Sequence, residues 1–227
     1  MSNVTGTALS INVGMAREFE YRGRTARSAI WKTPGAGPIA ARGVNLAGDE
    51  QADRGAHGGP DKAVYAYAVE DSRWWEREIG RPFARGEFGE NLTTEGIAVN
   101  DALVGERWMV GTTILEVSEP RIPCWRLGVR MNDEGFVRRF TEAMRPGAYL
   151  RIVTEGELTA GDEIRILEKP DTDLTVRDVF RIFTRDRQEA ARLLAVPAMS
   201  DSWKRWAADH LRAAGNRQAA PPKPGCC

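Results

Sequence analysis

Histidine and cysteine, two side chains that often carry metal or redox chemistry, are scarce in this chain. Its 227 residues include 2 histidines and 3 cysteines, and two of the cysteines, Cys226 and Cys227, are the last two residues. This number and this spacing do not describe the disulfide framework of a small secreted domain. We therefore expect a reducing environment, in which oxidation or metal capture at Cys226 and Cys227 is adventitious.

Net charge and long apolar runs are also missing. Lys and Arg together number 32, as do Asp and Glu, so no overall field draws the chain toward nucleic acid or an anionic membrane. No uncharged apolar run approaches the length of a membrane span, and the first residues lack a signal-peptide pattern. We therefore expect a cytoplasmic protein with no nucleic-acid or membrane partner, in which any anion site is local.

Alternating apolar residues and glycine-rich turns dominate the chain up to about residue 170. Leu9, Ile11 and Val13 alternate with polar side chains, which is typical of a half-buried strand. Strands are expected over residues 7–13, 28–32, 39–46, 63–69, 92–94, 107–110, 113–117, 148–153 and 163–167. Residues 15–27 are expected to form a charged loop. The many short strands predict a mainly β fold with a barrel-like domain over residues 1–170.

Helical spacing occurs at two places within this domain. Asp71 is expected to cap a short helix that ends at Gly80. A second helix is expected from about Asp133 to the break at Pro146.

Helices replace strands after residue 170. Thr175 and Asp178 form a capping-box pattern ahead of one helix, a second is expected over 188–194, and a third is expected from Ser200 to a stop at Gly215. Three short helices bury little surface alone, so they should pack together and against the barrel.

This change divides the chain into a barrel domain over 1–170, a small three-helix domain over 171–215 and a disordered tail over 216–227. His210, on the apolar face of the third helix, is expected to be a core or edge histidine and not a ligand.

Cys124, within residues 117–126, is the first candidate for chemistry. Pro120 and Pro123, which both precede it, fix φ and remove backbone donors, so the chain is expected to leave the sheet after Ser118 and turn. Arg121 and Arg126 flank the cysteine, and nearby cations stabilise a thiolate, the form that acts as nucleophile or soft metal ligand. A buried cysteine that behaves as a small hydrophobe is an equally good interpretation of this segment alone.

The loop over residues 48–62 is the second candidate. Its glycines can direct backbone N–H groups into a concavity that holds an anion, and Lys62 can add positive charge. His57 can donate, accept or bind metal. A solvated loop in which His57 has no role is the open alternative. Lys32, at the end of an expected strand, is a weaker candidate for an anion contact.

Glu90 and Asn91 form a third polar cluster, placed just before a strand. They can read the hydrogen-bonding edge of a heterocycle, or they can simply satisfy local backbone groups. Cys124, His57 and either Asn91 or Asp49 also have the residue types of a cysteine hydrolase. That chemistry requires the base within hydrogen-bond reach of the sulfur, and sequence spacing does not give this distance.

Taken together, several ordered segments resemble the MOSC domain family, named after the C-terminal domain of molybdenum cofactor sulfurases. They are similar above all to its YiiM-like branch, in which a short three-helix domain follows the barrel. The resemblance spans roughly residues 7–215, and its segments are 48–53, 57–64, 88–92 and 117–124.

The resemblance implies a MOSC-type β-barrel that binds the molybdopterin form of the molybdenum cofactor, with Cys124 as a sulfur ligand to the metal. The reaction of an enzyme with this cofactor also requires protons, and by residue type His57 is the nearest candidate donor. The pocket residues that follow from the resemblance are Lys32, Gly58, Gly59, Lys62, Glu90, Asn91 and Arg121.

Enzymes of this family resemble reductases of N-hydroxylated bases and related compounds, so the resemblance implies such a molybdenum-dependent oxidoreductase. The chain has no motif for a flavin, haem or iron–sulfur cluster, so the expected partners are an external flavoprotein-type reductase and a small N-hydroxylated substrate. A homodimer is one option for its assembly. Two alternatives stay open: a carrier of the cofactor or of sulfur, as a persulfide on Cys124, and the cysteine hydrolase. Larger relatives fuse further domains to the barrel, and the residues of this chain are not expected to form such a domain.

Overall fold

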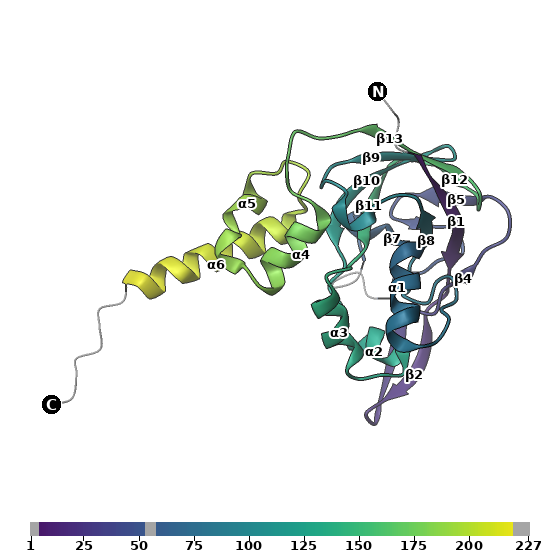
Figure 1. Cartoon of the computed structure of the whole chain (residues 1–227), viewed down its shortest axis with the longest axis horizontal. Helices are drawn as coiled ribbons and strands as arrows, with labels where there is room; N and C mark the ends of the chain where they lie inside the picture. Colours follow the sequence, from purple (N-terminus) through teal and green to yellow (C-terminus); the bar gives the residue numbers. More distant parts are fainter. Residues whose placement is uncertain (1–4, 53–57, 220–227) are drawn as a thin grey trace.

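The computed structural model describes residues 5–52 and 58–219. Its longer strands are β1 (Thr5–Val13), β7 (Val64–Ala68), β8 (Leu92–Glu95), β9 (Arg107–Val110), β10 (Thr113–Pro120), β11 (Ala148–Thr154) and β13 (Glu163–Glu168). Within the described residues these strands close a barrel in the order β13-β9-β10-β11-β7-β8-β1, with β1 pairing to β13 (Figure 1). Neighbours are antiparallel except β7 and β8, which run parallel. The predicted mainly β fold with a barrel is confirmed.

Aliphatic side chains fill the inside of the barrel. Ala8, Leu115, Val117, Leu150 and Ile164 are fully buried and belong to one cluster. Leu115 and Val117 lie two positions apart on β10, because side chains on a strand alternate between its two faces. Burial of this apolar surface is the main term that stabilises the closed barrel.

An aromatic cluster covers the outer side of β7. Three helices contribute side chains to it: α1 (Val69–Ile79), α2 (Trp125–Met131) and α3 (Phe136–Ala143). Figure 1 shows these helices beside the barrel. The rings of Tyr67 and Phe88 stack with centroids 4.4 Å apart, and Trp75 Nε1 donates to the Tyr67 hydroxyl at 3.0 Å. This cluster anchors the helices that follow the Cys124 turn.

The helix predictions for this domain are partly right. Gly80, with φ 76°, ends α1 as expected, but the N-cap is Ala68 and Asp71 lies inside the first turn. There the Asp71 carboxylate accepts from Asn100 Nδ2 at 2.6 Å. The helix expected from about Asp133 starts at Phe136, and α2 was not expected at all.

Two predictions for residues 15–32 are wrong. Residues expected to form a loop make a hairpin of β2 (Arg17–Tyr21) and β3 (Arg24–Ser28), while most of the strand expected over 28–32 is irregular. The hairpin has no fully buried face, so its sequence lacks the apolar alternation that marks a half-buried strand. Its aromatic side chains dock instead: Phe19 lies 4.9 Å from Trp31, and Tyr21 stacks on Trp125 at 4.5 Å.

Short strands complete the barrel domain. They are β4 (Thr33–Pro34), β5 (Ile39–Arg42), β6 (Asn45–Leu46) and β12 (Gly156–Leu158). β4 pairs with the end of β1, and β12, β5 and β6 form a separate small sheet. The single strand expected over 39–46 is therefore a pair of short strands.

β10 continues beyond the point at which it was expected to end. It runs to Pro120, which faces Ala148 on β11, and a bulge between Val117 and Glu119 shifts the register. β9 pairs with β10 only as far as Glu116, so Pro120 lies on a stretch with one strand neighbour. A proline is tolerated there because a second row of hydrogen bonds is not required.

The C-terminal helices are α4 (Val176–Thr184), α5 (Ala191–Leu194) and α6 (Asp201–Ala219). The predicted capping box is present, with Thr175 Oγ1 accepting from Asp178 N at 3.1 Å. Their apolar faces form one cluster with Val104 of the barrel domain, so the helices pack together and against the barrel as expected. α6 passes through Gly215 without stopping, and it includes residues 216–219 of the expected tail. Residues 220–227, with Cys226 and Cys227, lie outside the described residues.

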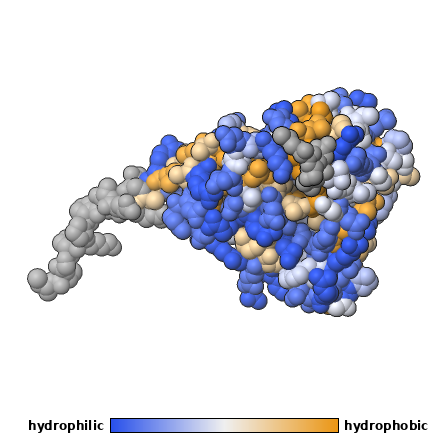
Figure 2. Space-filling model, turned by 45° about the horizontal axis from the view of Figure 1, so that its top comes forward, coloured by the Kyte–Doolittle hydropathy of each residue, from blue (hydrophilic) through white to orange (hydrophobic). Residues whose placement is uncertain are grey.

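Hydrophilic residues cover most of the face seen in Figure 2. In the described part of the chain, four large apolar side chains are exposed, and they are far apart in the sequence: Met15, Val153, Leu167 and Leu194. Among the described helices, none has the length and apolar character needed to cross a bilayer.

Candidate functional site

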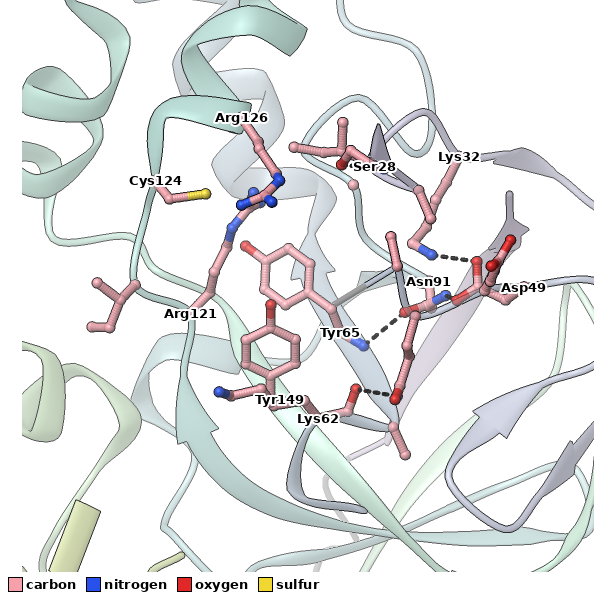
Figure 3. A pocket seen from close by; sticks show the side chains of 18 residues that line it. Ser28, Lys32, Asp49, Lys62, Tyr65, Asn91, Arg121, Cys124, Arg126 and Tyr149 are labelled. Carbon is pink, nitrogen blue, oxygen red and sulfur yellow. Dashed lines mark hydrogen bonds and ion pairs between the residues drawn. The ribbon is translucent and has the colours of Figure 1, made fainter. Parts of the chain in front are cut away.

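A cavity of about 100 Å³ lies where the Cys124 turn meets the loops after β3 and β6. Figure 3 shows side chains from these separate segments directed toward it. Its labelled polar and aromatic lining residues are Ser28, Lys32, Asp49, Lys62, Tyr65, Asn91, Arg121, Cys124, Arg126 and Tyr149. Five of the residues predicted as pocket or metal contacts therefore meet in one place.

Cys124 is half-buried and lines this cavity. It is the N-cap of α2, with extended φ and ψ of −129° and 174°, and its carbonyl oxygen accepts from Leu127 N at 2.9 Å. Figure 3 shows its sulfur pointing toward the guanidinium groups of Arg121 and Arg126. The interpretation of Cys124 as a small hydrophobe inside the core is wrong, because the sulfur borders a cavity among cations.

Arg121 places a fixed positive charge beside Cys124. It is 7% exposed, it donates to the carbonyl oxygen of Phe88, and its guanidinium lies 5.1 Å from the ring centroid of Tyr65. Burial alone lowers its pKa, whereas Tyr65, Tyr149 and Cys124 raise it, and the net direction is upward. The guanidinium therefore stays charged, and it can hold an anion or stabilise a thiolate.

Lys32 belongs to a buried polar network on another wall. Its ammonium group pairs with Asp49, which also accepts from Gly14 N and from Asn91 Nδ2, each at 2.9 Å. Asn91 Oδ1 in turn accepts from Tyr65 N at 3.1 Å. Burial lowers the pKa of Lys32, while Asp49 opposes this effect. The network fixes the Asp49 end of the ion pair to the backbone of the barrel.

Lys62 is placed by a short 3-10 helix, η1 (Pro60–Lys62). Gly59 enters this turn with φ 97°, a conformation that favours glycine, and its N–H donates to Gln51 Oε1 at 2.8 Å. Neither Gly58 nor Gly59 lines the cavity, and the Gly59 N–H already has an acceptor. These glycines shape the loop instead of binding the anion as expected.

Glu90 does not line the cavity either, which corrects its expected role as a pocket wall. It is 1% exposed and accepts from Gly86 N at 2.7 Å, Phe88 N at 3.0 Å and Thr93 Oγ1 at 2.9 Å. These bonds hold the turn that precedes β8, directly behind Asn91. Burial raises the pKa of Glu90. His57 lies outside the described residues.

Sequence reasoning missed the aromatic wall of the cavity. Tyr65 and Tyr149, from the paired strands β7 and β11, face each other with ring centroids 5.1 Å apart. Burial raises the pKa of Tyr149 to about 12, with Arg121 opposing. The sequence predicted only a strand over 63–69, and β7 is buried along its whole length, so its pattern did not distinguish Tyr65 from core residues. The one available signal was the hydroxyl group of Tyr65, because a buried tyrosine hydroxyl requires a hydrogen-bond partner. In the structure this hydroxyl donates to Pro146 O at 2.8 Å.

Comparison with known proteins identifies the class to which this barrel belongs. Residues 53–165 match the MOSC domain family. The protein YflK of Bacillus subtilis is 31% identical over 201 residues, which cover 87% of this chain and 91% of YflK. A Gibberella moniliformis protein named "Reductase" is 31% identical over 194 residues, 84% of this chain and 34% of that protein. The chain belongs to the MOSC domain family.

Within the family, the similarity extends past the barrel. The crystal structure of YiiM from Geobacillus stearothermophilus superposes with a TM-score of 0.75 at 30% sequence identity. The match covers 91% of this chain and 99% of that chain, so it extends beyond the barrel domain. This places the chain in the YiiM-like branch.

Proposed function

We propose that the cavity binds the molybdenum cofactor, with Cys124 as a sulfur ligand to the metal, and that the protein reduces N-hydroxylated bases or related compounds. One observation carries the proposal: a half-exposed cysteine lines a cavity together with Lys62, Arg121 and Arg126, and with a Lys32–Asp49 ion pair on another wall. A soft sulfur donor and several cations suit a metal cofactor that also carries a phosphate.

The donor set fits a metal that brings most of its own ligands. Among the described residues, no cluster of three or more His, Cys, Asp or Glu side chains is placed to hold a metal ion. Cys124 alone would not retain a free transition metal, because such ions require several protein ligands. A pterin that supplies further sulfur donors removes this difficulty.

Individual residues can be given roles on this basis. Cys124 Sγ would ligate the metal, while Arg121 and Lys62 would hold the phosphate from two sides of the cavity. Tyr65 and Tyr149, whose rings are tilted by 41° to each other, form an aromatic wall that a planar ring could contact. The bound cofactor would supply the two-electron oxygen-transfer chemistry that side chains lack.

The proposed reaction consumes electrons and protons from outside the cavity. An N-hydroxylated substrate R–NHOH takes up two electrons and two protons, the N–O bond breaks, and R–NH2 and water form. The electrons would come from an external flavoprotein-type reductase. His57 is the proposed proton donor, since imidazole titrates near neutral pH. The similarity to a protein named "Reductase" supports this class of reaction.

Metal analysis of protein made in a host that synthesises the cofactor tests the proposal. We expect near-stoichiometric molybdenum together with pterin, and reduction of an N-hydroxylated base when a reductase supplies electrons. Sulfane sulfur without metal would support the sulfur carrier instead, and the absence of both would leave the cysteine hydrolase.

Variants of the cysteines complete the test. Cys124→Ser should abolish reduction of N-hydroxylated substrates and leave the circular dichroism spectrum unchanged, because the sulfur is at a cavity and not in the core. Changing Cys226 and Cys227 together to serine is the matched control and should alter neither property. Full activity of Cys124→Ser would refute the site.

A further inference from the structure

Glu119 is a buried charge that the proposed reaction does not use. It lies on β10, one strand position from Pro120, and is 2% exposed. Isolated buried carboxylates are costly, so such a group requires partners. Its position between the cavity and the C-terminal helices suggests what those partners do.

On the cavity side, Glu119 Oε1 lies 3.5 Å from Nζ of Lys62. Lys62 lines the cavity and its side chain is 22% exposed, whereas that of Glu119 is 3% exposed. The carboxylate therefore sits behind the lysine as seen from a ligand in the cavity. An anion in the cavity and Glu119 would compete for the same ammonium group.

On the opposite side, Glu119 meets the start of α6. Burial raises the pKa of Glu119, and the side chains of Ser200 and Trp203 beside the carboxylate oppose this shift. Its Oε2 atom has no hydrogen-bond partner within the described part of the chain. Ser200 is 2% and Trp203 6% exposed, so both belong to the interface between the helices and the barrel. The helices thus help to keep the carboxylate charged where it faces Lys62.

Two further contacts join the helices to the same wall. Arg151 donates to Ala198 O at 2.8 Å and also pairs with Asp61, the residue before Lys62 in η1. Ile122 lines the cavity and packs against the hydrophobic cluster of the C-terminal helices. The wall that carries Lys62 is therefore built on the helical domain as well as on the barrel.

We propose that Glu119 is a positioning residue that draws the Lys62 ammonium toward β10, and that the C-terminal helices hold Glu119 in place, so that they set the affinity of the cavity for phosphate-bearing ligands. The inference rests on the proposed binding of a phosphate-bearing cofactor in this cavity. Among the described residues, the helical domain contributes none to the lining of the cavity, and the proposal nevertheless gives it a function in ligand binding.

Inorganic phosphate is a suitable probe, because it tests the anion site without molybdenum or turnover. Its binding to the full chain, purified without cofactor, can be followed by NMR chemical-shift titration. Glu119→Gln removes the competing charge and keeps the shape, so phosphate should bind tighter by on the order of threefold. Lys62→Met should weaken binding by about fivefold. Glu106→Gln is the matched control, since this buried carboxylate accepts from Trp108 Nε1 at 2.7 Å and does not line the cavity.

The double variant decides whether Glu119 acts through Lys62. Once Lys62 is methionine, Glu119→Gln should have no further effect on phosphate binding. Ser200→Ala should shift the affinity in the same direction as Glu119→Gln, by less, because the carboxylate loses one group that favours its charge. Thermal unfolding of each variant verifies that it is folded.

The possible results separate the two proposals. If the native chain does not bind phosphate, the proposed cofactor site is contradicted, and this inference with it. If phosphate binds and Lys62→Met weakens it, but Glu119→Gln leaves the affinity unchanged, only this inference is overturned. A tightening by Glu119→Gln that persists without Lys62 also overturns it.

Discussion

Lys32 and Asp49 form an ion pair in the wall of the cavity, with side chains that are 8% and 4% exposed. The pair joins the segment before β4 to the loop after β6. Both charges are removed from water, so the loss of either one leaves the other buried without its counter-charge, which is costly. Asp49→Asn should therefore destabilise the protein by about 3 kcal/mol in urea unfolding. The double variant Lys32→Met with Asp49→Asn should recover part of this loss. If its loss of unfolding free energy equals the sum of the losses in the two single variants, the pairing is contradicted.

The pH dependence of stability provides a second test of Lys32. Its folded pKa is lowered from 10.5, mainly by burial, so below 10.5 the unfolded chain binds more protons than the folded one. The contribution of Lys32 to stability should therefore rise as the pH rises toward 10.5. The free energy of unfolding of the native chain minus that of Lys32→Met, measured between pH 7 and 10, should increase with pH. A difference that falls over this range would contradict the direction of the pKa shift.

Gly86 packs behind the same wall and cannot carry a side chain. It has φ +80°, and a Cβ atom there would lie 2.5 Å from the carbonyl oxygen of Lys32. Gly23, with φ +71°, is a matched control, because a Cβ atom added there would have no atom within 4 Å. Its substitution therefore measures only the cost of the backbone conformation. Gly23→Ala should cost about 1 kcal/mol and Gly86→Ala clearly more, because the second also displaces Lys32. Equal losses in urea unfolding would show that the close approach is unimportant.

Arg121 should be irreplaceable by lysine. Its guanidinium donates to Phe88 O and lies over the ring of Tyr65 at the same time, which an ammonium group cannot reproduce. Arg121→Lys should weaken phosphate binding about tenfold while the protein stays folded. Arg130→Lys is the control, since Arg130 pairs with Glu87 at 3.0 Å and does not line the cavity. An unchanged affinity in Arg121→Lys would remove Arg121 from the anion site.

The hairpin of β2 and β3 should restrain the Cys124 turn. Tyr21 stacks on Trp125, the first residue of α2, at 4.5 Å and 15°. Tyr21→Ala removes this stacking, worth about 1 kcal/mol, and should let Cys124 react faster with a thiol reagent. Tyr21→Phe keeps the ring and should not change the rate. The reaction should be followed in a chain whose Cys226 and Cys227 are serine, and equal rates for the two Tyr21 variants would refute the restraint.

The sequence predicted best where local pattern and tertiary contacts agree. β1 and the hairpin of β9 and β10 alternate visibly, because one face of each strand is buried in the barrel. The capping box at Thr175 depends on residues three positions apart, so it was also readable. Cys124 was found through its flanking cations and through the family resemblance.

Other features depend on contacts that no local pattern records. The β2 and β3 strands are held by Phe19 and Tyr21 docking on distant tryptophans, not by a buried face. The helix α2 is short and follows a proline, so its spacing carried little signal. The family resemblance placed both Glu90 and Asn91 in the cavity wall, yet neighbouring residues near a turn point in different directions. Only the assembled barrel shows which of the two meets the cavity.

X-ray absorption at the molybdenum edge tests the Cys124 bond most directly. Protein loaded with cofactor and its Cys124→Ser variant should be compared in the same oxidation state. Ligation by Cys124 predicts one sulfur neighbour fewer around molybdenum in the variant. Identical sulfur shells in the two spectra would contradict Cys124 as the ligand.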